Sequence, residues 1–202
     1  MQGVEMRQVR ARYSDRTITV YQAYSEEIAR AAVAAGRFVA PFQRERMTWI
    51  KPSFLWMMYR CGWATKPGQE RVLAIEIRRD GFEWALANAA LSDFDRALYP
   101  DQPTWARKVR TSPVRVQWDP ERDLSGQPLP YRSLQVGLGG VSVDRYVDEW
   151  TETITDITDL VRQIDRDRNA AAALLPAETI YPLPPHVGAA VGAWPSDRIR
   201  LT

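Results

Sequence analysis

The chain has 202 residues, of which 45% are hydrophobic and 26% charged, an ordinary balance for a globular protein with a substantial core. Its formal net charge of +2 is too small to imply a polyanion partner by itself. A single cysteine and a single histidine exclude an internal disulfide framework and argue against zinc, so no metal is expected. No segment resembles a membrane helix or a signal peptide, so we expect no membrane partner and a cytoplasmic location.

The pattern of elements predicts one α+β domain with a central, largely antiparallel sheet flanked by helices. Residues 1–16 carry four arginines and little apolar material, which predicts a basic, solvated N-terminal arm. Residues 17–175 mix strand and helix patterns without an internal repeat. Residues 176–202 are rich in proline and glycine and are expected to pack irregularly along the domain surface.

Alternating apolar residues and helix caps place the elements along the chain. Strands are expected at 17–22, 47–51, 72–77, 114–118, 134–138 and 150–154. Helices are expected to begin near Ser25, Ser53, Asp80, Val141 and Thr158 or Asp159. Residues 91–113 show no regular pattern, and the turn-rich residues 119–131 are expected to form a lid or a surface loop.

The densest stretch of large side chains is residues 43–63, which hold three tryptophans at a spacing of seven. Trp49, Trp56 and Trp63 are a pattern typical of buried core, since aromatic rings bury large areas and seven residues repeat a helical face. Pro52 interrupts a continuous helix, so a buried helix is expected only from Ser53 to the stop at Gly62.

The polar residues of the same stretch suggest a binding site. Arg44, Arg46, Lys51 and Ser53, with backbone N–H groups at the start of the helix, would form a cradle for an anion. Trp49 beside them would stack on a base or a nicotinamide-like ring. The stretch therefore predicts an anion or nucleotide site, with a purely structural core as the alternative.

Other candidates lie outside this stretch. Tyr21 and Gln22 end the first strand and gain weight if that end faces Lys51. Gln135 would be costly on a buried strand unless it is hydrogen-bonded, which makes it a candidate ligand for a substrate amide or hydroxyl. The acids available downstream are Glu149, Glu152 and Asp156, a group typical of solvated surface.

Three segments carry a family resemblance: residues 20–24 (VYQAY), 46–60 (RMTWIKPSFLWMMYR) and 134–138 (LQVGL). Together they resemble the bacterial and fungal family called domain of unknown function 4291, over about residues 6 to 195. The resemblance covers nearly the whole chain, but the family brings no established activity, so it implies no reaction.

A more distant likeness is to the ADP-ribosyltransferase fold, which implies NAD as cofactor. It would place Tyr21 or Gln22 near the ribose and Trp49 and Ser53 near the nicotinamide. Tyr59 would lie in the stacking wall. The first strand lacks the expected opening His or Arg, and no acid corresponds securely to the usual catalytic Glu. The residues that would stand in for that Glu as catalytic groups are Gln135 and Glu149.

Three functions follow from these patterns. The leading hypothesis is a nucleotide- or NAD-type ligand site, with ADP-ribosyl-type transfer as its sharpest form. The second is a non-catalytic module that binds RNA or single-stranded nucleic acid, in which the same cations and aromatics track a backbone. The third is a structural or partner-binding protein whose dense motif is only core. Sequence does not distinguish oligomeric states.

Overall fold

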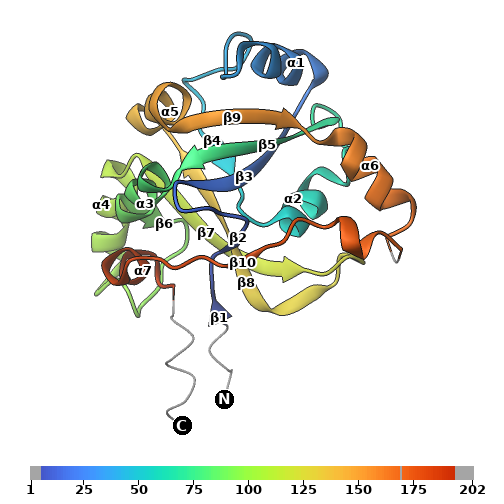
Figure 1. The fold of residues 1–202 in the computed structure, drawn as a ribbon. Coiled ribbons are helices and arrows are strands. Elements are labelled where there is room, and N and C mark those ends of the chain that lie inside the picture. The colour runs from blue at the N-terminus through green and yellow to red at the C-terminus, as the bar shows by residue number, and fades with distance from the viewer. Residues whose placement is uncertain (1–5, 169, 194–202) are drawn as a thin grey trace.

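The computed structural model describes residues 6–168 and 170–193, which form the α+β fold expected from the sequence (Figure 1). The strands are β1 (Met6–Arg7), β2 (Arg10–Ala11), β3 (Thr17–Tyr24), β4 (Thr48–Ile50), β5 (Arg71–Arg78), β6 (Ala89–Leu91), β7 (Val114–Arg122), β8 (Pro128–Leu138), β9 (Thr151–Asp156) and β10 (Thr179–Ile180). The helices are α1 (Glu26–Ala35), α2 (Phe54–Cys61), α3 (Arg79–Ala87), α4 (Gln102–Thr111), α5 (Val141–Arg145), α6 (Thr158–Arg166) and α7 (Pro185–Val191). A π-helical turn spans Tyr146–Trp150 and a 3₁₀ turn spans Ala170–Leu174.

The expected central sheet is divided into two. One sheet is antiparallel with the order β3-β5-β9. The other has the order β1-β8-β7-β6, with β4 also paired to β8. Its β4-β8-β7 part is antiparallel, whereas β1 and β6 each pair in parallel. The prediction of a largely antiparallel arrangement therefore holds, but it describes two sheets.

The main core lies between the two sheets. β3 and β5 contribute Ile18, Val20, Ile75 and Ile77, while β7 and β8 contribute Val114, Val116, Leu134 and Val136. A second, smaller core lies on the other face of the three-stranded sheet, where α2 and α6 bring Phe54, Met58, Val161 and Ile164 against Tyr21 and Val72. Each of these strands alternates its side chains between two environments, as a period of two requires.

The chain links the two sheets where β4 ends. There the backbone of Lys51 exchanges two hydrogen bonds with Tyr21 of β3, with N–O distances of 2.7 and 3.2 Å. Residue 51 therefore leaves the edge of β8 and turns toward the other sheet. α2 begins directly after this crossing, so the end of β4 is fixed from both sides.

Two helices confirm the capping signals most directly. α1 ends at Gly36, whose left-handed φ of 64° suits glycine, although the Ser25 side chain makes no capping bond. α2 begins after Ser53, whose hydroxyl accepts a hydrogen bond from the N–H of Trp56 at 3.2 Å. Gly62 ends α2 in the same left-handed region. Within the described residues, no helix has the length and apolar character needed to cross a bilayer.

Several expected elements are wrong in extent. α3 begins at Arg79, so Asp80 lies inside the helix and is not its cap. Residues 91–113 contain α4, whose N-cap Asp101 accepts from Thr104 N at 2.7 Å. Residues 119–131 form neither a lid nor a long loop: they complete the β7-β8 hairpin, which closes through 123–127. Pro120 lies inside β7, where a register shift follows it, and proline is tolerated at such irregularities.

The N-terminal and C-terminal segments pack together. β2 pairs with β10, and Val9 and Ala11 are buried in the main core, so residues 8–11 are not a solvated arm. The C-terminal segment is more regular than expected, since it contains β10 and α7. Figure 1 shows this segment crossing the molecule from α6 to α7, which contacts α3.

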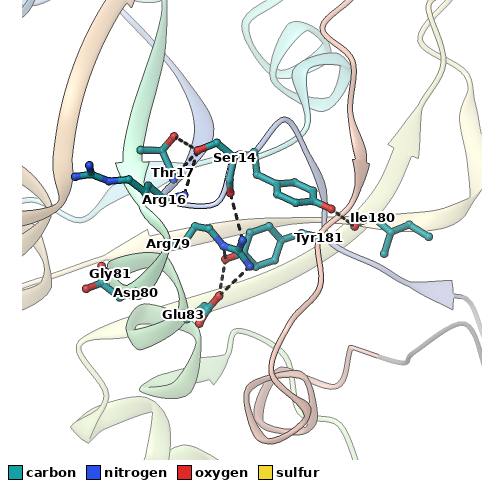
Figure 2. Close-up of polar contacts among 10 residues, drawn as sticks. Ser14, Arg16, Thr17, Arg79, Asp80, Gly81, Glu83, Ile180 and Tyr181 are labelled. Atoms are coloured by element: carbon teal, nitrogen blue, oxygen red, sulfur yellow. Dashed lines mark hydrogen bonds and ion pairs between the residues drawn. The ribbon is translucent and has the colours of Figure 1, made fainter.

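One polar network anchors that crossing (Figure 2). Arg79 donates from Nε to the Tyr181 hydroxyl at 2.8 Å, and that hydroxyl donates to Glu83 Oε1 at 2.6 Å. The Arg79 guanidinium also lies over the rings of Tyr13 and Tyr181, 5.5 and 4.8 Å from their centroids. Because Tyr181 is itself buried, this network ties β10 to the start of α3.

Candidate functional site

Polar side chains gather on the face of the five-stranded sheet that is turned away from the main core. Alternation along the strands puts Gln117, Asp119 and Glu121 of β7 on one face with Ser133 and Gln135 of β8. The register sets Gln117 opposite Gln135 and Asp119 opposite Ser133. A sheet face with so many polar side chains is normally exposed to solvent. Here, however, three of them are buried, with 8% of their surface exposed or less: Glu121, Ser133 and Gln135.

β4 extends the same face on the other side of β8. Trp49 lies directly opposite Gly137, and a Cβ built on Gly137 would come within 2.9 Å of the Trp49 ring and 2.8 Å of the Met47 sulfur. Glycine is therefore required here, because the indole rests on its backbone. Lys51 and Ser53 follow Trp49 at a spacing of two. We call this region the polar sheet face; it comprises Lys51, Ser53, Gln117, Asp119, Glu121, Ser133 and Gln135.

Lys51 is the buried cation of this face, with 7% of its surface exposed. Its ammonium donates to the carbonyl of Trp49 at 3.2 Å, and the same carbonyl accepts from Gln22 Nε2 at 3.2 Å. The pKa of Lys51 is lowered from its ordinary 10.5 to about 8, first by burial and then by the charge of Arg60, while Cys61 and Asp119 oppose the change. A bound anion would offset this desolvation and favour the charged form.

Asp119 holds the centre of the face in place. Its Oδ1 accepts from Gln117 Nε2 at 2.9 Å and its Oδ2 accepts from Gln135 Nε2 at 3.0 Å. The three side chains thus form a bridge across the two strands. The amide of Gln135 is buried, as a strand position predicts, and its hydrogen bond to the Asp119 carboxylate offsets the free-energy cost of that burial.

Glu121 closes the face next to α2. Burial raises the pKa of its carboxyl, and hydrogen bonds from the backbone of Arg122 and from the hydroxyls of Ser53 and Ser133 oppose that rise. Its Oε1 accepts from Arg122 N at 2.9 Å. A carboxyl that is buried, hydroxyl-bonded and raised in pKa is a group typical of acid–base or charge-stabilising chemistry.

A second carboxyl, that of the half-buried Glu178, comes from the C-terminal segment. Its Oε1 accepts from the N–H of Phe54, the first residue of α2, at 2.7 Å. The pKa of Glu178 is raised to about 8, mainly by desolvation and also by the charge of Glu121, while the hydrogen bond from Phe54 N–H and the charge of Arg10 oppose the rise. Within the parts of the chain that the structure describes, these carboxyl groups form no cluster of three or more metal-ligating side chains.

The start of α2 is therefore occupied from within. The sequence assigned its N–H groups and Ser53 to an external anion. The structure gives Phe54 N to the carboxylate of Glu178 and Trp56 N to the hydroxyl of Ser53. An anion on the polar sheet face would meet Lys51 instead of the helix terminus.

The two residues predicted at the end of the first strand lie beside this region. Tyr21 is buried, packs edge-to-face on Phe54 with ring centroids 5.5 Å apart, and is bridged to Lys51 through the backbone. Gln22 donates to Thr48 Oγ1 at 2.6 Å and accepts from the Tyr146 hydroxyl at 2.7 Å. Gln22 therefore supports the end of β4 from the core side.

The structure places the remaining predicted residues elsewhere. The guanidinium of Arg44 pairs with Asp148 through two hydrogen bonds, of 2.5 and 2.8 Å, and reaches Asp144 at 3.3 Å. Glu149, offered as a catalytic acid, has a side chain 54% exposed and pairs with Arg145 at 3.0 Å. Neither has a contact with the polar sheet face.

Arg46 and Tyr59 each line a cavity away from the polar sheet face. Arg46 lines a cavity of about 300 Å³ between α1 and β4. Tyr59 is 41% exposed, stacks on Trp56 at 5.4 Å, and lines a cavity of about 250 Å³ near the β7-β8 turn. The predicted set thus divides. Six residues come together at the end of β4: Tyr21, Gln22, Trp49, Lys51, Ser53 and Gln135. Arg44, Arg46, Tyr59 and Glu149 lie elsewhere.

Sequence reasoning missed Gln117, Asp119, Glu121, Ser133 and Glu178. The first three alternate at a spacing of two and continue the pattern of the expected strand 114–118, so the period of two was the available signal. Glu178 gave no local signal, because its position depends on the crossing of the C-terminal segment.

A protein-family model matches residues 8–181, which include all of the polar sheet face and Glu178. The chain belongs to the family described as domain of unknown function (DUF4291). The match confirms the resemblance carried by residues 20–24, 46–60 and 134–138. No curated protein matched the DUF4291 chain. The family description names no activity, so function has to be argued from the site.

Proposed function

We propose that the polar sheet face binds a nucleotide-type small molecule of the NAD class. The observation that carries the proposal is Lys51, a buried lysine held among buried hydrogen-bonding groups with a single hydrogen bond to Trp49 O in the described structure. Keeping a lysine in such surroundings is costly unless a partner compensates its charge. A phosphate group supplies that compensation.

The neighbours of Lys51 suit the rest of such a ligand. Gln135 and Asp119 offer amide and carboxylate groups to ribose hydroxyls. Trp49, half-buried against Gly137, offers a ring for stacking on a base or nicotinamide. Arg44 and Arg46, assigned to the phosphates from sequence alone, have no part in this proposal.

The chemistry proposed for this site is ADP-ribosyl-type transfer with Glu121 as the catalytic acid group, in place of Glu149. The bond between ribose and nicotinamide would break, and its electron pair would leave with nicotinamide. The carboxylate of Glu121 would stabilise the oxocarbenium-like centre until an acceptor, water in the simplest case, forms the new bond. The buried position of Glu121 between Ser53 and Ser133 supports this role.

Burial favours a small molecule over a nucleic-acid strand. A groove that tracks a backbone presents its cations and aromatic rings to solvent along an open path. Lys51, Ser53 and Gln135 are instead 8% exposed or less. RNA binding is therefore the less favoured function, and the experiment below includes RNA as a probe to distinguish it.

Ligand-induced thermal stabilisation tests the binding proposal. NAD, ATP and a short RNA are added separately to wild type, Lys51→Ala and the control Lys66→Ala, since Lys66 is an exposed lysine whose ammonium donates to the carbonyl of Arg60. We expect NAD or ATP to raise the Tm of wild type and of Lys66→Ala but not of Lys51→Ala. No stabilisation by either nucleotide contradicts the proposal, and a salt-sensitive shift with RNA alone favours the nucleic-acid alternative.

Nicotinamide release from NAD tests the chemistry separately. Glu121→Gln keeps the size of the side chain and removes its charge. If Glu121 stabilises the oxocarbenium-like centre, the variant should bind NAD as wild type does and lose at least about 100-fold in rate. A wild-type rate in Glu121→Gln, or no release by wild type, would refute the transfer and leave binding to be judged by the first experiment.

A further inference from the structure

A cavity that shares no residue with the polar sheet face lies between α1 and β4. It has a volume of about 300 Å³, at the lower end of the range for small-molecule pockets. The residues that line it are Tyr24, Ile28, Pro41, Phe42, Gln43, Arg46, Met47 and Thr48. Most of this lining is apolar, and Met47 is 39% exposed there.

The aromatic floor of the cavity is firmly built. The rings of Tyr24 and Phe42 meet edge-to-face with centroids 6.0 Å apart, and both pack against Phe38 of the main core. A surface that holds aromatic side chains in a fixed edge-to-face arrangement accepts a further flat ring well. The cavity therefore fits a small ligand with a planar apolar body.

The hydroxyls that line the cavity are already satisfied. The oxygens of Tyr24 and Thr48 share a hydrogen bond at 2.9 Å, and Thr48 also accepts from Gln22 at 2.6 Å. They contribute little further hydrogen bonding to an occupant. The polar atoms left for a ligand are those of Gln43 and Arg46.

Arg46 differs from its neighbour Arg44 in one decisive respect. Arg44 is paired with Asp144 and Asp148, whereas Arg46 has no carboxylate within ion-pair distance in the described part of the chain. A guanidinium at the rim of an apolar cavity is complementary to a carboxylate, which it can bind through two parallel hydrogen bonds.

We propose that this cavity binds a small aromatic carboxylate, with its ring against Tyr24 and Phe42 and its carboxylate on Arg46. The proposal is independent of the nucleotide site, because it uses none of the polar sheet face. A neutral aromatic ligand would contact the aromatic floor but leave Arg46 without an anion. An aliphatic carboxylate would bind Arg46 but present no ring to the floor. The ligand class is therefore defined by an aromatic ring and a carboxylate in one molecule.

Calorimetric or NMR titration with benzoate tests this, with benzamide as the neutral probe of the same shape and hexanoate as the aliphatic carboxylate. We expect wild type to bind benzoate at least about tenfold more tightly than benzamide or hexanoate. Arg46→Gln should remove the preference over benzamide, while Arg44→Gln, from the same loop, should keep it. Both arginines are on the surface, so folding of the variants is checked simply by an unchanged Tm.

Three affinity results would overturn the proposal. They are the absence of benzoate binding at millimolar concentration, binding that Arg46→Gln leaves unchanged, and equal affinity for benzoate and hexanoate. The third would mean that the aromatic floor is not recognised. NMR shifts that map to Trp49 and Gln135, and not to Tyr24 and Met47, would likewise contradict it.

Discussion

At the scale of single residues, the account depends on charged groups that are buried. Glu178 is half-buried, yet desolvation raises its pKa to about 8 and its carboxylate accepts from the N–H of Phe54. A group whose pKa is higher in the folded state binds more protons there than in the unfolded chain. Its contribution to stability is therefore fully present below about pH 4.5 and is lost as the pH rises toward about 8.

Glu178→Gln makes this measurable, because glutamine keeps the acceptor oxygen but cannot ionise. The free energy of unfolding is measured by urea titration at pH 5 and at pH 8.5. The stability of the variant minus that of wild type should be about 1 to 3 kcal/mol larger at pH 8.5 than at pH 5. Glu27→Gln, at an exposed position in the first turn of α1, serves as the control. A difference that does not change with pH would show that Glu178 is not desolvated.

Lys51 predicts that ligand binding also weakens as the pH rises. Its pKa of about 8 means that the free protein loses this charge as the pH rises through 8. Affinity for an anionic nucleotide should therefore be constant below about pH 7.5 and fall above it, by about tenfold per pH unit once the amine is neutral. Titration calorimetry between pH 6.5 and 9.5 measures the profile, and Lys51→Arg, which stays charged, should flatten it.

The residue types in the sequence predict part of the site. The rest depends on strand pairing. Lys51, Ser53 and Gln135 stood out because a lysine, a cap and an amide lay among apolar neighbours. Asp119 and Glu121 looked like loop residues because prolines surround them, and only the pairing of β7 with β8 puts them on a sheet. Local sequence does not encode that pairing.

At the scale of elements, close packing around glycines makes sharp predictions. Gly81 lies inside α3, and a Cβ built on it would come within 2.3 Å of the Trp150 ring. Trp150 is buried at the end of the π-helical turn and has no room to withdraw. This contact fixes the approach of α3 to the segment that leads into β9.

Gly81→Ala should therefore destabilise the protein by about 3 kcal/mol, despite the higher helix propensity of alanine. Gly188→Ala is the matched control, because Gly188 lies inside α7 and its added Cβ would make only ordinary contact, 3.6 Å from the nearest atom. We expect that control to be neutral or slightly stabilising, as measured by urea denaturation. Equal effects of the two substitutions would contradict the packing described for α3.

The elements best predicted from sequence are those with both a start and a stop signal. α1 and α2 have a serine before them and a left-handed glycine after them, and both were found. α4 was missed because its start, Asp101 with a proline in the first turn, lies in a stretch punctuated by prolines. α7 was missed for the same reason, since its apolar residues follow a run of prolines.

At the scale of the whole molecule, the C-terminal segment closes the fold. It brings Glu178 to α2, pairs β10 with β2 and packs α7 against α3. Trp118 also donates from its indole to Val191 O at 2.8 Å. The division into an N-terminal arm, a domain and a C-terminal tail follows the amino-acid composition of the chain. It does not follow the packing, because both terminal segments contribute side chains to the core.

Tyr181→Phe tests how strongly this closure holds. The change removes the hydroxyl that links Arg79 to Glu83 while leaving the buried ring, so we expect a loss of about 1 to 3 kcal/mol in the free energy of unfolding. Tyr13→Phe is the control, since its exposed hydroxyl makes one bond of 3.2 Å to Ile180 O. A smaller effect at Tyr181 than at Tyr13 would mean that the network in Figure 2 does not anchor the segment.

The central claim is that the face bearing Lys51, Asp119 and Gln135 binds a nucleotide-type molecule. The most direct test is an NMR titration of the isotopically labelled protein with NAD. We predict shifts at the Gln117 and Gln135 side-chain amides and at Gly137 N–H, all absent in Lys51→Ala. Saturating NAD that leaves these signals in place, or shifts only residues of the cavities near Arg46 and Tyr59, would contradict the account.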